Sequence, residues 1–419
     1  MKKVLFISYF WPPSGKASLH WPLDIIRHLP KDEIEPIILT VEEDTFTQKD
    51  ESLLSKVDPS WRVIKSKALE PFDIYRKFIG KNKNEKLVAS ETISLENKSL
   101  AHRISIWIRM NLFIPDARVG WNFTATKRAK KILTQEKIEA IVSIGPPHSS
   151  HLIGLKLSKK FSIPHIPVLI DPWVDIIYYK NFKRNFITKK IDNHFEKSVL
   201  QNAKRVIFVT KSAQEDYINN YQFLKDKSSV LYWGYDASSF ERVALKKEIR
   251  NEKLLVHAGN IFAYQNPKKL WDQIKIENEN GDNIRIKFIG TVDKEILNYI
   301  TQIGLSDSVQ VAGFLPFPTM IEEICSADML LVCSSEPRHV PGKLFEAMRT
   351  GNPIIAFGNN NTEVKQILND ADAGIMFNYD ENVAEFFRKN FIKNYDNKKI
   401  EKYDRAVISK EFAALIKSL

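Results

Sequence analysis

The sequence predicts an α/β protein of two domains, each built on a doubly wound parallel sheet that is covered by helices. Short apolar runs typical of buried strands alternate with amphipathic helical segments along most of the chain, which is the pattern of parallel sheets. With 419 residues the chain is too long for one typical core and suits two domains of about 200 residues. The functional loops of such sheets lie at the carboxyl ends of the strands.

The composition excludes several other classes of protein. Hydrophobic residues make up 43% of the chain, and no apolar run reaches the length of about 18 residues that a transmembrane helix needs. The run Val4–Phe10 is too short for a signal peptide and lacks a small-residue cleavage site after it. The two cysteines, Cys325 and Cys333, predict a reducing compartment without disulfides. No group of His and Cys has the spacing of metal ligands, so no metal is expected.

The positive charge is unevenly distributed along the chain. The net charge is +11, and the whole excess lies in residues 1–250, whereas the remainder is mildly acidic. This asymmetry favours an anionic surface or an anionic substrate at the N-terminal half. Nucleic acid would produce a similar asymmetry.

The first domain begins with a predicted strand, Val4–Tyr9, then a loop, an amphipathic helix to about Leu29 and a second strand, Ile34–Val41. The loop follows a strand and is therefore expected at the active edge of the sheet. It lacks the GxGxxG pattern, and no acidic ribose partner follows at the usual distance, so a dinucleotide oxidoreductase is disfavoured. The residues of this loop that are candidates for acceptor or phosphate contacts are Ser14, Gly15 and Lys16.

Residues 66–99 are polar and Lys-rich without clear periodicity, and we interpret them as an excursion from the sheet. An apolar stripe at helical spacing follows, from Leu100 to Phe113, with cationic flanks. A helix with an aromatic-rich apolar face and flanking cations can lie in a membrane interface. A helix that faces the core has the same periodicity. The charge of this half favours the membrane, and the candidate contacts are Arg103, Trp107, Ile108 and Arg109.

Two further strands of the first domain end in polar residues. Ala140–Ile144 precedes a segment with His148 and His151, which we expect to point to the active edge, although a satisfied surface histidine is the alternative. Ser149 and Ser150 are predicted to cap the helix that follows. A strand at Val168–Ile170 ends in Asp171, for which acceptor binding or catalysis is expected, with capping of a loop as the alternative.

The second domain is predicted to begin its sheet at Leu254–Ala258, with Gly259 and Asn260 as the first loop. A later strand, Met329–Cys333, is followed by a helix that opens near residues 341–342 and stops at Gly351–Pro353. Backbone N–H groups at that opening favour a bound anion. Lys343 adds a full charge there, and Glu346 lies beside it on the same face, where a carboxylate can accept hydrogen bonds from sugar hydroxyls.

The stretch Val340–Pro353, read as VPGKLFEAMRTGNP, resembles the nucleotide-sugar site of GT-B glycosyltransferases of the family 4 type. Their C-terminal domain carries two glutamates separated by seven residues and a helix that ends in a Gly-x-Pro turn. Glu346 matches the second glutamate and Gly351–Pro353 match the turn, whereas Arg338 stands in place of the first glutamate. The variant PGKLFE resembles a branch of bacterial sugar transferases that build surface polysaccharides.

Three motifs of the first half resemble the same branch. They are PD...GW in residues 115–121, GPP.S.H in residues 145–151 and DPW in residues 171–173. Four motifs in this order over most of the chain are much more specific than any one of them.

The resemblance implies two Rossmann-like domains that face each other across a cleft. Residues 1–235 would form the acceptor-side domain, with a C-terminal helix of about 397–419 packed back on it, and residues 236–396 the domain that binds the nucleotide-sugar. Family members commonly carry an Arg for the diphosphate where this chain has Gln265, so we expect Lys343 to take that role. The donor-binding residues implied are Gly259, Asn260, Gln265, Pro341, Gly342, Lys343, Leu344 and Glu346, and the catalytic ones Asp171, His148 and Lys343.

The expected activity is that of a retaining glycosyltransferase, with no cofactor or metal and a UDP- or GDP-linked sugar as donor. The acceptor is expected to be lipid-linked or a polysaccharide of the cell surface. The protein is then expected in the cytoplasm, peripheral on the inner face of the membrane and without nucleic acid as a partner. Two alternatives stay open: an epimerase of the GT-B fold, and an inactive relative that serves as a membrane-associated binding or assembly subunit.

Overall fold

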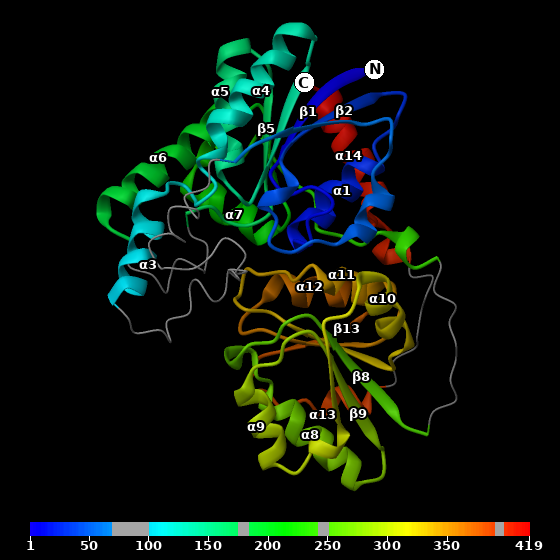
Figure 1. The fold of residues 1–419 in the computed structure, drawn as a ribbon. Coiled ribbons are helices and arrows are strands. Elements are labelled where there is room, and N and C mark those ends of the chain that lie inside the picture. The colour runs from blue at the N-terminus through cyan, green and yellow to red at the C-terminus, as the bar shows by residue number, and fades with distance from the viewer. Residues whose placement is uncertain (69–99, 175–183, 242–250, 390–397) are drawn as a thin grey trace. The chain divides into compact units, whose positions relative to one another are not determined.

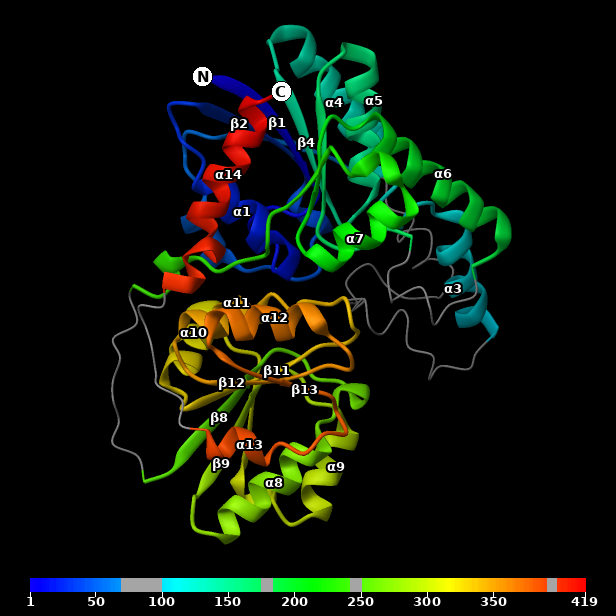
Figure 2. The same ribbon diagram turned by 180° about the vertical axis from the view of Figure 1, so that it is seen from behind.

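The computed structural model describes residues 1–68, 100–174, 184–241, 251–389 and 398–419. It divides into two compact units (Figures 1 and 2). Unit 1 consists of Met1–Tyr232 together with Ser409–Leu419, and unit 2 is the continuous segment Trp233–Ile408. The second domain predicted from the sequence is residues 236–396, whereas unit 2 runs from Trp233 to Ile408.

Unit 1 is built on a seven-stranded sheet in the order β3-β2-β1-β4-β5-β6-β7, and every neighbouring pair is parallel. The sheet forms because apolar runs such as β1 and β4 are buried on both faces, as in parallel sheets generally. Its strands are β1 Lys2–Ser8, β2 Ile34–Val41, β3 Arg62–Ser66, β4 Ala140–Gly145, β5 His165–Leu169, β6 Val206–Phe208 and β7 Ser228–Val230.

The helices of unit 1 connect these parallel strands. Trp121 and Ala125 of α4, with Ile153 of α5, belong to the same core cluster as Leu5 and Ile7 of β1. The helices are α1 His20–Arg27, α3 Leu100–Leu112, α4 Trp121–Gln135, α5 Ser149–Phe161, α6 Phe186–Asn202 and α7 Lys211–Asn220, with the later part of α14 Arg405–Lys417.

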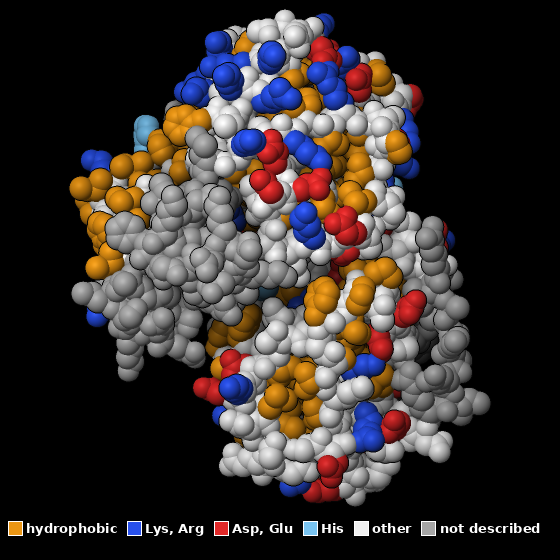
Figure 3. All heavy atoms as spheres, in the orientation of Figure 1, with side chains coloured by type: hydrophobic (Ala, Val, Ile, Leu, Met, Phe, Trp, Pro, Cys, Tyr) orange, Lys and Arg blue, Asp and Glu red, His pale blue; other side chains and the backbone are white. Residues whose placement is uncertain are grey.

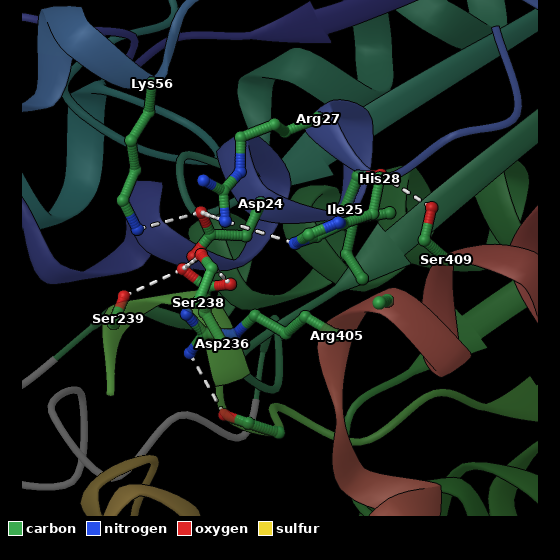
Figure 4. A network of polar contacts seen from close by, with 12 residues as sticks. Asp24, Ile25, Arg27, His28, Lys56, Asp236, Ser238, Ser239, Arg405 and Ser409 are labelled. Atoms are coloured by element: carbon green, nitrogen blue, oxygen red, sulfur yellow. Dashed lines mark hydrogen bonds and ion pairs between the residues drawn. The ribbon is translucent and has the colours of Figure 1, made fainter. Parts of the chain in front are cut away.

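The segment Ser409–Leu419 is held to the start of the chain by specific contacts. Ser409 Oγ donates to the carbonyl of Ile25 at 2.7 Å, and the rings of Trp21 and Phe412 lie 6.3 Å apart. Figure 4 shows the Ser409 bond beside the buried Asp24 carboxylate of α1, which Lys56 Nζ approaches to 3.0 Å. The two helices α1 and α14 lie side by side in Figures 1 and 2.

Unit 2 is a second parallel sheet, with six strands in the order β10-β9-β8-β11-β12-β13. Trp271 packs edge-on against Phe288 in its core, with ring centroids 5.8 Å apart. The strands are β8 Lys253–Ala258, β9 Ile284–Ile289, β10 Val309–Gly313, β11 Met329–Cys333, β12 Ile354–Phe357 and β13 Gly374–Phe377. The helices are α8 Lys268–Glu279, α9 Lys294–Gln302, α10 Phe317–Ser326, α11 Lys343–Arg349, α12 Thr362–Ala371 and α13 Ala384–Arg388.

Both sheets reverse their strand order at the same place, between the first strand and the fourth. These switch points are β1/β4 in unit 1 and β8/β11 in unit 2. Ligands of doubly wound sheets bind outside the carboxyl ends of the strands at such a point. The loops after these four strands therefore define where each unit is expected to bind its ligand.

Several sequence predictions about elements need correction. The strand expected at Val168–Ile170 is β5, His165–Leu169, because its pairing with β4 starts at His165. β3 was not predicted, and most of the predicted excursion at 66–99 lies outside the described residues. Helix α3 begins at Leu100, as its apolar stripe indicated, and ends at Leu112, one residue before the end of that stripe. Within the described part of the chain, no helix is long and apolar enough to cross a bilayer.

Candidate active site

The carboxyl edge of the unit 2 sheet brings Gly259 and Lys343 together. Gly259 follows β8 with a φ of +114°, and a Cβ placed on it would lie 3.0 Å from Lys343 Nζ. Glycine therefore lets the ammonium lie against the backbone of this loop. Asn260 holds the loop in place, because its Oδ1 accepts a hydrogen bond from the Thr291 N–H at 3.1 Å. The site thus has a cation at the switch point of the sheet.

The Lys343 ammonium is drawn into the protein and is only partly exposed. Its Nζ lies 3.2 Å from Nε2 of His257, the penultimate residue of β8. Burial lowers the pKa of Lys343 to about 8, an effect that the nearby Glu346 carboxylate opposes. The amine is therefore still largely charged at neutral pH, and an anion bound beside it would raise that pKa again.

The start of α11 differs in detail from the prediction. Gly342 is the N-cap residue and Lys343 the first helical residue. The N–H of Leu344 is already bonded to the carbonyl of Pro341 at 2.9 Å, and the Leu344 side chain is buried in the core. A helix as short as Lys343–Arg349 also has a weak dipole, so the Lys343 charge carries more of the attraction for an anion.

Glu346 is oriented by contacts inside unit 2. Its Oε1 lies 4.0 Å from the guanidinium of the fully buried Arg405. Arg405 in turn donates to the carbonyls of Trp233 at 3.1 Å and Gly234 at 3.0 Å, and Figure 4 shows it from close by. A Cβ on Gly342 would lie 2.5 Å from the indole nitrogen of Trp233, so the backbone and this ring are in close contact.

Gln265 is engaged within the fold. It is buried, its Nε2 donates to the Cys333 carbonyl at 3.2 Å, and its Oε1 accepts from the Phe262 N–H at 3.2 Å. The side chain therefore fastens the loop after β8 to β11. A phosphate contact by Gln265 would require it to leave these partners.

In unit 1, His148 follows β4 and stacks on Trp173, with ring centroids 5.1 Å apart and planes at 7°. Burial lowers the pKa of His148 to about 3, so this histidine is neutral at physiological pH. Trp173 is fixed in turn, because its Nε1 donates to the Asp192 carboxylate at 2.8 Å. The structure therefore places a neutral imidazole at the carboxyl edge of the sheet, held flat against an indole.

His151 lies in the interior, so the expectation that it points to the active edge is wrong. The Ser143 Oγ lies 2.8 Å from His151 Nδ1 and 2.7 Å from His165 Nε2, and all three residues are buried. Burial lowers the pKa of both histidines. This polar chain joins β4, α5 and β5.

Asp171 follows β5, two residues before Trp173, and its side chain is partly buried. Burial raises the pKa of Asp171 to about 6. Among the described residues, no hydrogen bond or ion pair to its carboxylate is found, so the alternative role of capping a loop has no support. A carboxyl group with a pKa near neutrality suits proton transfer or the binding of a hydroxyl group.

The cap of α5 comes from Asp116 rather than from Ser149 or Ser150. The Asp116 carboxylate accepts from the Ser149 N–H at 2.9 Å and from its Oγ at 3.0 Å. His148 occupies the N-cap position with helical dihedrals and makes no side-chain cap. Asp116 in the PD...GW motif therefore has a structural role that sequence reasoning did not assign.

The loop after β1 places Lys16 close to Arg118. Burial and the Arg118 charge both lower the pKa of Lys16. Gly15 N–H donates to the Gln48 carbonyl at 2.9 Å, and Ser14 is buried. Two neighbouring cations favour an anionic ligand at this edge of unit 1.

The apolar stripe of α3 faces solvent instead of the core. Trp107 is 50% exposed and Ile104 49%, whereas Asn111 on another face is buried. Asn111 ties α3 to the start of α6, because its Oδ1 accepts from the Asn185 N–H at 2.7 Å. The four residues predicted to contact a membrane lie on this helix, and Ile108 is exposed with Trp107 and Arg103.

The start of α6 extends this apolar surface, which sequence reasoning missed. Phe186 is 77% exposed and Ile187 69%. Figure 3 shows apolar side chains gathered over α3 and the beginning of α6, with basic side chains beside them. We call this the α3/α6 patch. Its apolar members are Ile104, Trp107, Ile108, Leu112, Phe186, Ile187 and Ile191, and its basic members are Arg103, Arg109, Lys189 and Lys190.

Two family models match consecutive parts of the chain. One, described as glycosyl transferases group 1, matches residues 240–407. The other, described as glycosyltransferase family 4, matches residues 91–239. No curated protein sequence matches the chain.

Solved structures share the fold over the full length of the chain. Sucrose-phosphate synthase from Thermosynechococcus elongatus is 12% identical with a TM-score of 0.65, covering 100% of this chain and 99% of its own. HepE from Anabaena, in complex with UDP and glucose, is 15% identical with a TM-score of 0.62 and full coverage of both chains. The lipopolysaccharide outer core galactosyltransferase WaaB, in its apo form, is 14% identical with a TM-score of 0.59 and again full coverage of both.

Two doubly wound parallel sheets, together with these matches, define a glycosyltransferase of the GT-B fold. Within this class the chain is a family 4-like glycosyltransferase. The α/β fold expected from the sequence is thereby confirmed.

Proposed function

We propose that this glycosyltransferase moves a sugar from a nucleotide-sugar held by unit 2 to an acceptor held by unit 1, with retention of configuration and without a metal. The observation that carries the proposal is the Lys343 ammonium held against Gly259 at the switch point of the unit 2 sheet. A cation at that place can stabilise the charge that grows on a leaving diphosphate. HepE, which shares the fold, was solved with UDP and with UDP-glucose, so a UDP-linked sugar is the first donor to test.

The acceptor in this proposal is a lipid-linked sugar or a growing polysaccharide of the cell surface. Three features of unit 1 support it: the Lys16 and Arg118 pair, the Asp171 carboxyl with its raised pKa, and the α3/α6 patch. The pair of cations suits a phosphate-bearing acceptor. The patch suits a membrane surface, so we place the protein on the cytoplasmic face of the membrane as a peripheral enzyme.

Incubation of the protein with UDP- and GDP-sugars and extracted lipid-linked acceptors tests the proposal directly. Acceptor-dependent release of the free nucleotide supports transfer. Conversion of the donor into an epimer without nucleotide release would favour the epimerase alternative. Tight nucleotide binding with no turnover of any donor would favour the inactive assembly subunit, for which Arg338 in place of the first glutamate and Gln265 in place of Arg are the motivating features.

We expect Glu346→Gln to weaken binding of the matching nucleoside diphosphate by about 1–3 kcal/mol, because the amide loses charge-assisted hydrogen bonds. Titration calorimetry measures this. Glu295→Gln is the matched control, since Glu295 also stands in the first turn of a unit 2 helix, α9. Unchanged affinity in the Glu346 variant would remove this carboxylate from the donor site.

We expect Trp107→Glu to release the protein from vesicles of anionic phospholipid. Losing the burial of this ring costs about 2 kcal/mol, which corresponds to roughly 30-fold in partitioning. The fold should survive, because Trp107 is half-exposed. Co-sedimentation at low salt measures the effect. The control is Phe314→Glu in unit 2, which alters another exposed aromatic residue, 74% exposed against 50% for Trp107. Failure of the unaltered protein to co-sediment would refute the membrane proposal, and unfolding of the Trp107 variant would mean that the stripe supports the fold.

A further inference from the structure

His257 is a polar residue in the buried interior of the unit 2 sheet. It lies at the carboxyl end of β8, is 1% exposed, and stands edge-on to Phe288 with ring centroids 6.2 Å apart. A polar side chain in such surroundings destabilises a fold unless its hydrogen bonds are made. Both ring nitrogens of His257 have a partner, and those partners identify what the ring does.

The two hydrogen bonds of His257 define its tautomer. Nδ1 lies 3.0 Å from the carbonyl oxygen of Leu331 on β11, which only accepts, so Nδ1 carries the proton. In a neutral ring Nε2 is then an acceptor, and the Lys343 ammonium at 3.2 Å donates to it. The ring is neutral because burial and the Lys343 charge hold the pKa of His257 well below its usual value, and hydrogen bonds with backbone groups of Leu331 and Asn260 only partly oppose them.

The other titratable groups around Lys343 are Cys333, His339 and Glu346, and His257 is the one whose ring nitrogen is bonded to the ammonium. Burial raises the pKa of the Cys333 thiol of β11 to about 12 and lowers that of His339, in the loop before α11, to about 4, so both are neutral. Within the part of the chain that the structure describes, the charged group that raises the pKa of Lys343 is Glu346, on the same helix, and it also lies 4.0 Å from Arg405.

We propose that His257 is a positioning residue for sugar transfer: its Nε2 accepts from Lys343 and holds that ammonium beside Gly259, where it meets the diphosphate of the donor. The inference rests on the proposed donor site of unit 2. An apolar residue at position 257 would leave the lysine without this acceptor, and the ammonium would move or lose its proton. The role is distinct from packing, because it depends on one nitrogen atom and not on the shape of the ring.

Two variants separate positioning from packing. His257→Phe keeps an aromatic ring in the core and removes both hydrogen bonds. His257→Gln offers an N–H for the Leu331 carbonyl and an oxygen for Lys343, at a similar reach. We expect the Phe variant to lose roughly 10-fold in kcat with less than about threefold change in KM for the donor, and the Gln variant to stay within about threefold of the unaltered enzyme.

The pH dependence of UDP binding is a second readout that packing alone would not move. Affinity for UDP should fall as pH rises through the pKa of Lys343, because the ammonium loses its charge. Without the acceptor the charged form is less stable, so in the Phe variant this fall should begin at lower pH, whereas the Gln variant should follow the unaltered protein. Calorimetric titration with UDP between about pH 6 and pH 9 measures it, since that interval brackets the expected pKa.

The outcomes distinguish this inference from the proposed function. If the unaltered protein neither binds a nucleoside diphosphate nor turns over any donor, the proposed function itself fails. If it does both, and His257→Phe matches it in kcat and in pH dependence with an unchanged melting temperature, His257 only packs. Should the Phe variant not fold, His257→Asn replaces it: the shorter amide can bond to Leu331 but cannot reach Lys343. Asn behaving like Gln would then overturn the inference.

Discussion

Replacing Lys343 by Met is expected to lower kcat by roughly 100-fold, comparable to the loss of one strong electrostatic donor. Methionine keeps an unbranched stem of similar length and removes only the charge. The leaving diphosphate carries its greatest negative charge in the transition state, so turnover should suffer more than the affinity for the donor. The thermal stability of the variant should not fall, because the removed ammonium is partly buried and has a lowered pKa.

Steady-state kinetics with the donor that supports turnover measures this effect, and two lysines of α8 provide controls. Lys268→Met and Lys269→Met alter exposed cations near the start of that helix and should leave kcat within a few-fold. Near-normal turnover of Lys343→Met, with a large loss in either control, would transfer the role to α8. We do not expect Gln265→Arg to rescue Lys343→Met, because position 265 is buried and both the oxygen and the nitrogen of the Gln265 amide are bonded within the fold.

Asp171→Asn is expected to lower kcat by roughly 100-fold and to stabilise the protein at neutral pH. The rate should fall because an amide can neither accept a proton nor hold a hydroxyl as strongly as a carboxylate. Stability should rise because burial makes the ionised form of Asp171 unfavourable, with a folded pKa of about 6 against an ordinary value of 3.8. By linkage the gain is about 1–3 kcal/mol.

The stability that Asp171 contributes should change with pH in one direction only. Between about pH 4 and pH 6 the folded protein binds a proton at Asp171 that the unfolded chain has released, so the stability contributed by this group falls as pH rises. The advantage of the Asn variant should therefore grow through that interval and stay constant above it. Melting temperatures across the pH range measure this, and a variant less stable than the unaltered protein at pH 7 would contradict it.

Asp116→Asn is the matched control for this experiment. Burial raises the pKa of Asp116 as well, but its carboxylate accepts hydrogen bonds from Ser149 and from the Arg118 N–H. An amide cannot accept all of them, so the Asp116 variant should lose about 1–2 kcal/mol of stability. Burial raises the pKa of both aspartates, yet the change in stability should be a gain for Asp171→Asn and a loss for Asp116→Asn. This difference would distinguish a carboxylate that caps a helix from one that serves the reaction.

The sequence was most informative where periodicity and strand hydrophobicity are strong. β2 has the predicted bounds because Ile34–Val41 is an apolar run buried along nearly its whole length. The bounds of α3 followed from its apolar spacing, but periodicity could not decide whether that face is buried. Exposure of Trp107 settles that the stripe is not core, because only the fold determines which face of a helix has neighbours.

The residues whose roles the sequence analysis did not predict make contacts with residues that are distant in sequence. His257 was hidden within a strand, and a single polar residue in an otherwise apolar run was the available signal. Its partner Lys343 is on another element, so their contact requires the sheet order. Asp116 likewise caps a helix that begins at Ser149, and local rules for N-caps consider only neighbouring residues. Roles of single residues in the candidate site therefore stay predictions until the variants are measured.

The two units are assembled from the chain in different ways, and this has a consequence for how the protein folds during synthesis. Unit 2 is one continuous segment, Trp233–Ile408, whereas unit 1 includes Ser409–Leu419, which donate and accept hydrogen bonds with the start of the chain. On the ribosome, unit 2 has its whole sequence before unit 1 does. Unit 1 must wait, partly formed, with the surface around Trp21 still lacking Phe412. Chaperone demand during translation should therefore centre on the half of the protein that is made first.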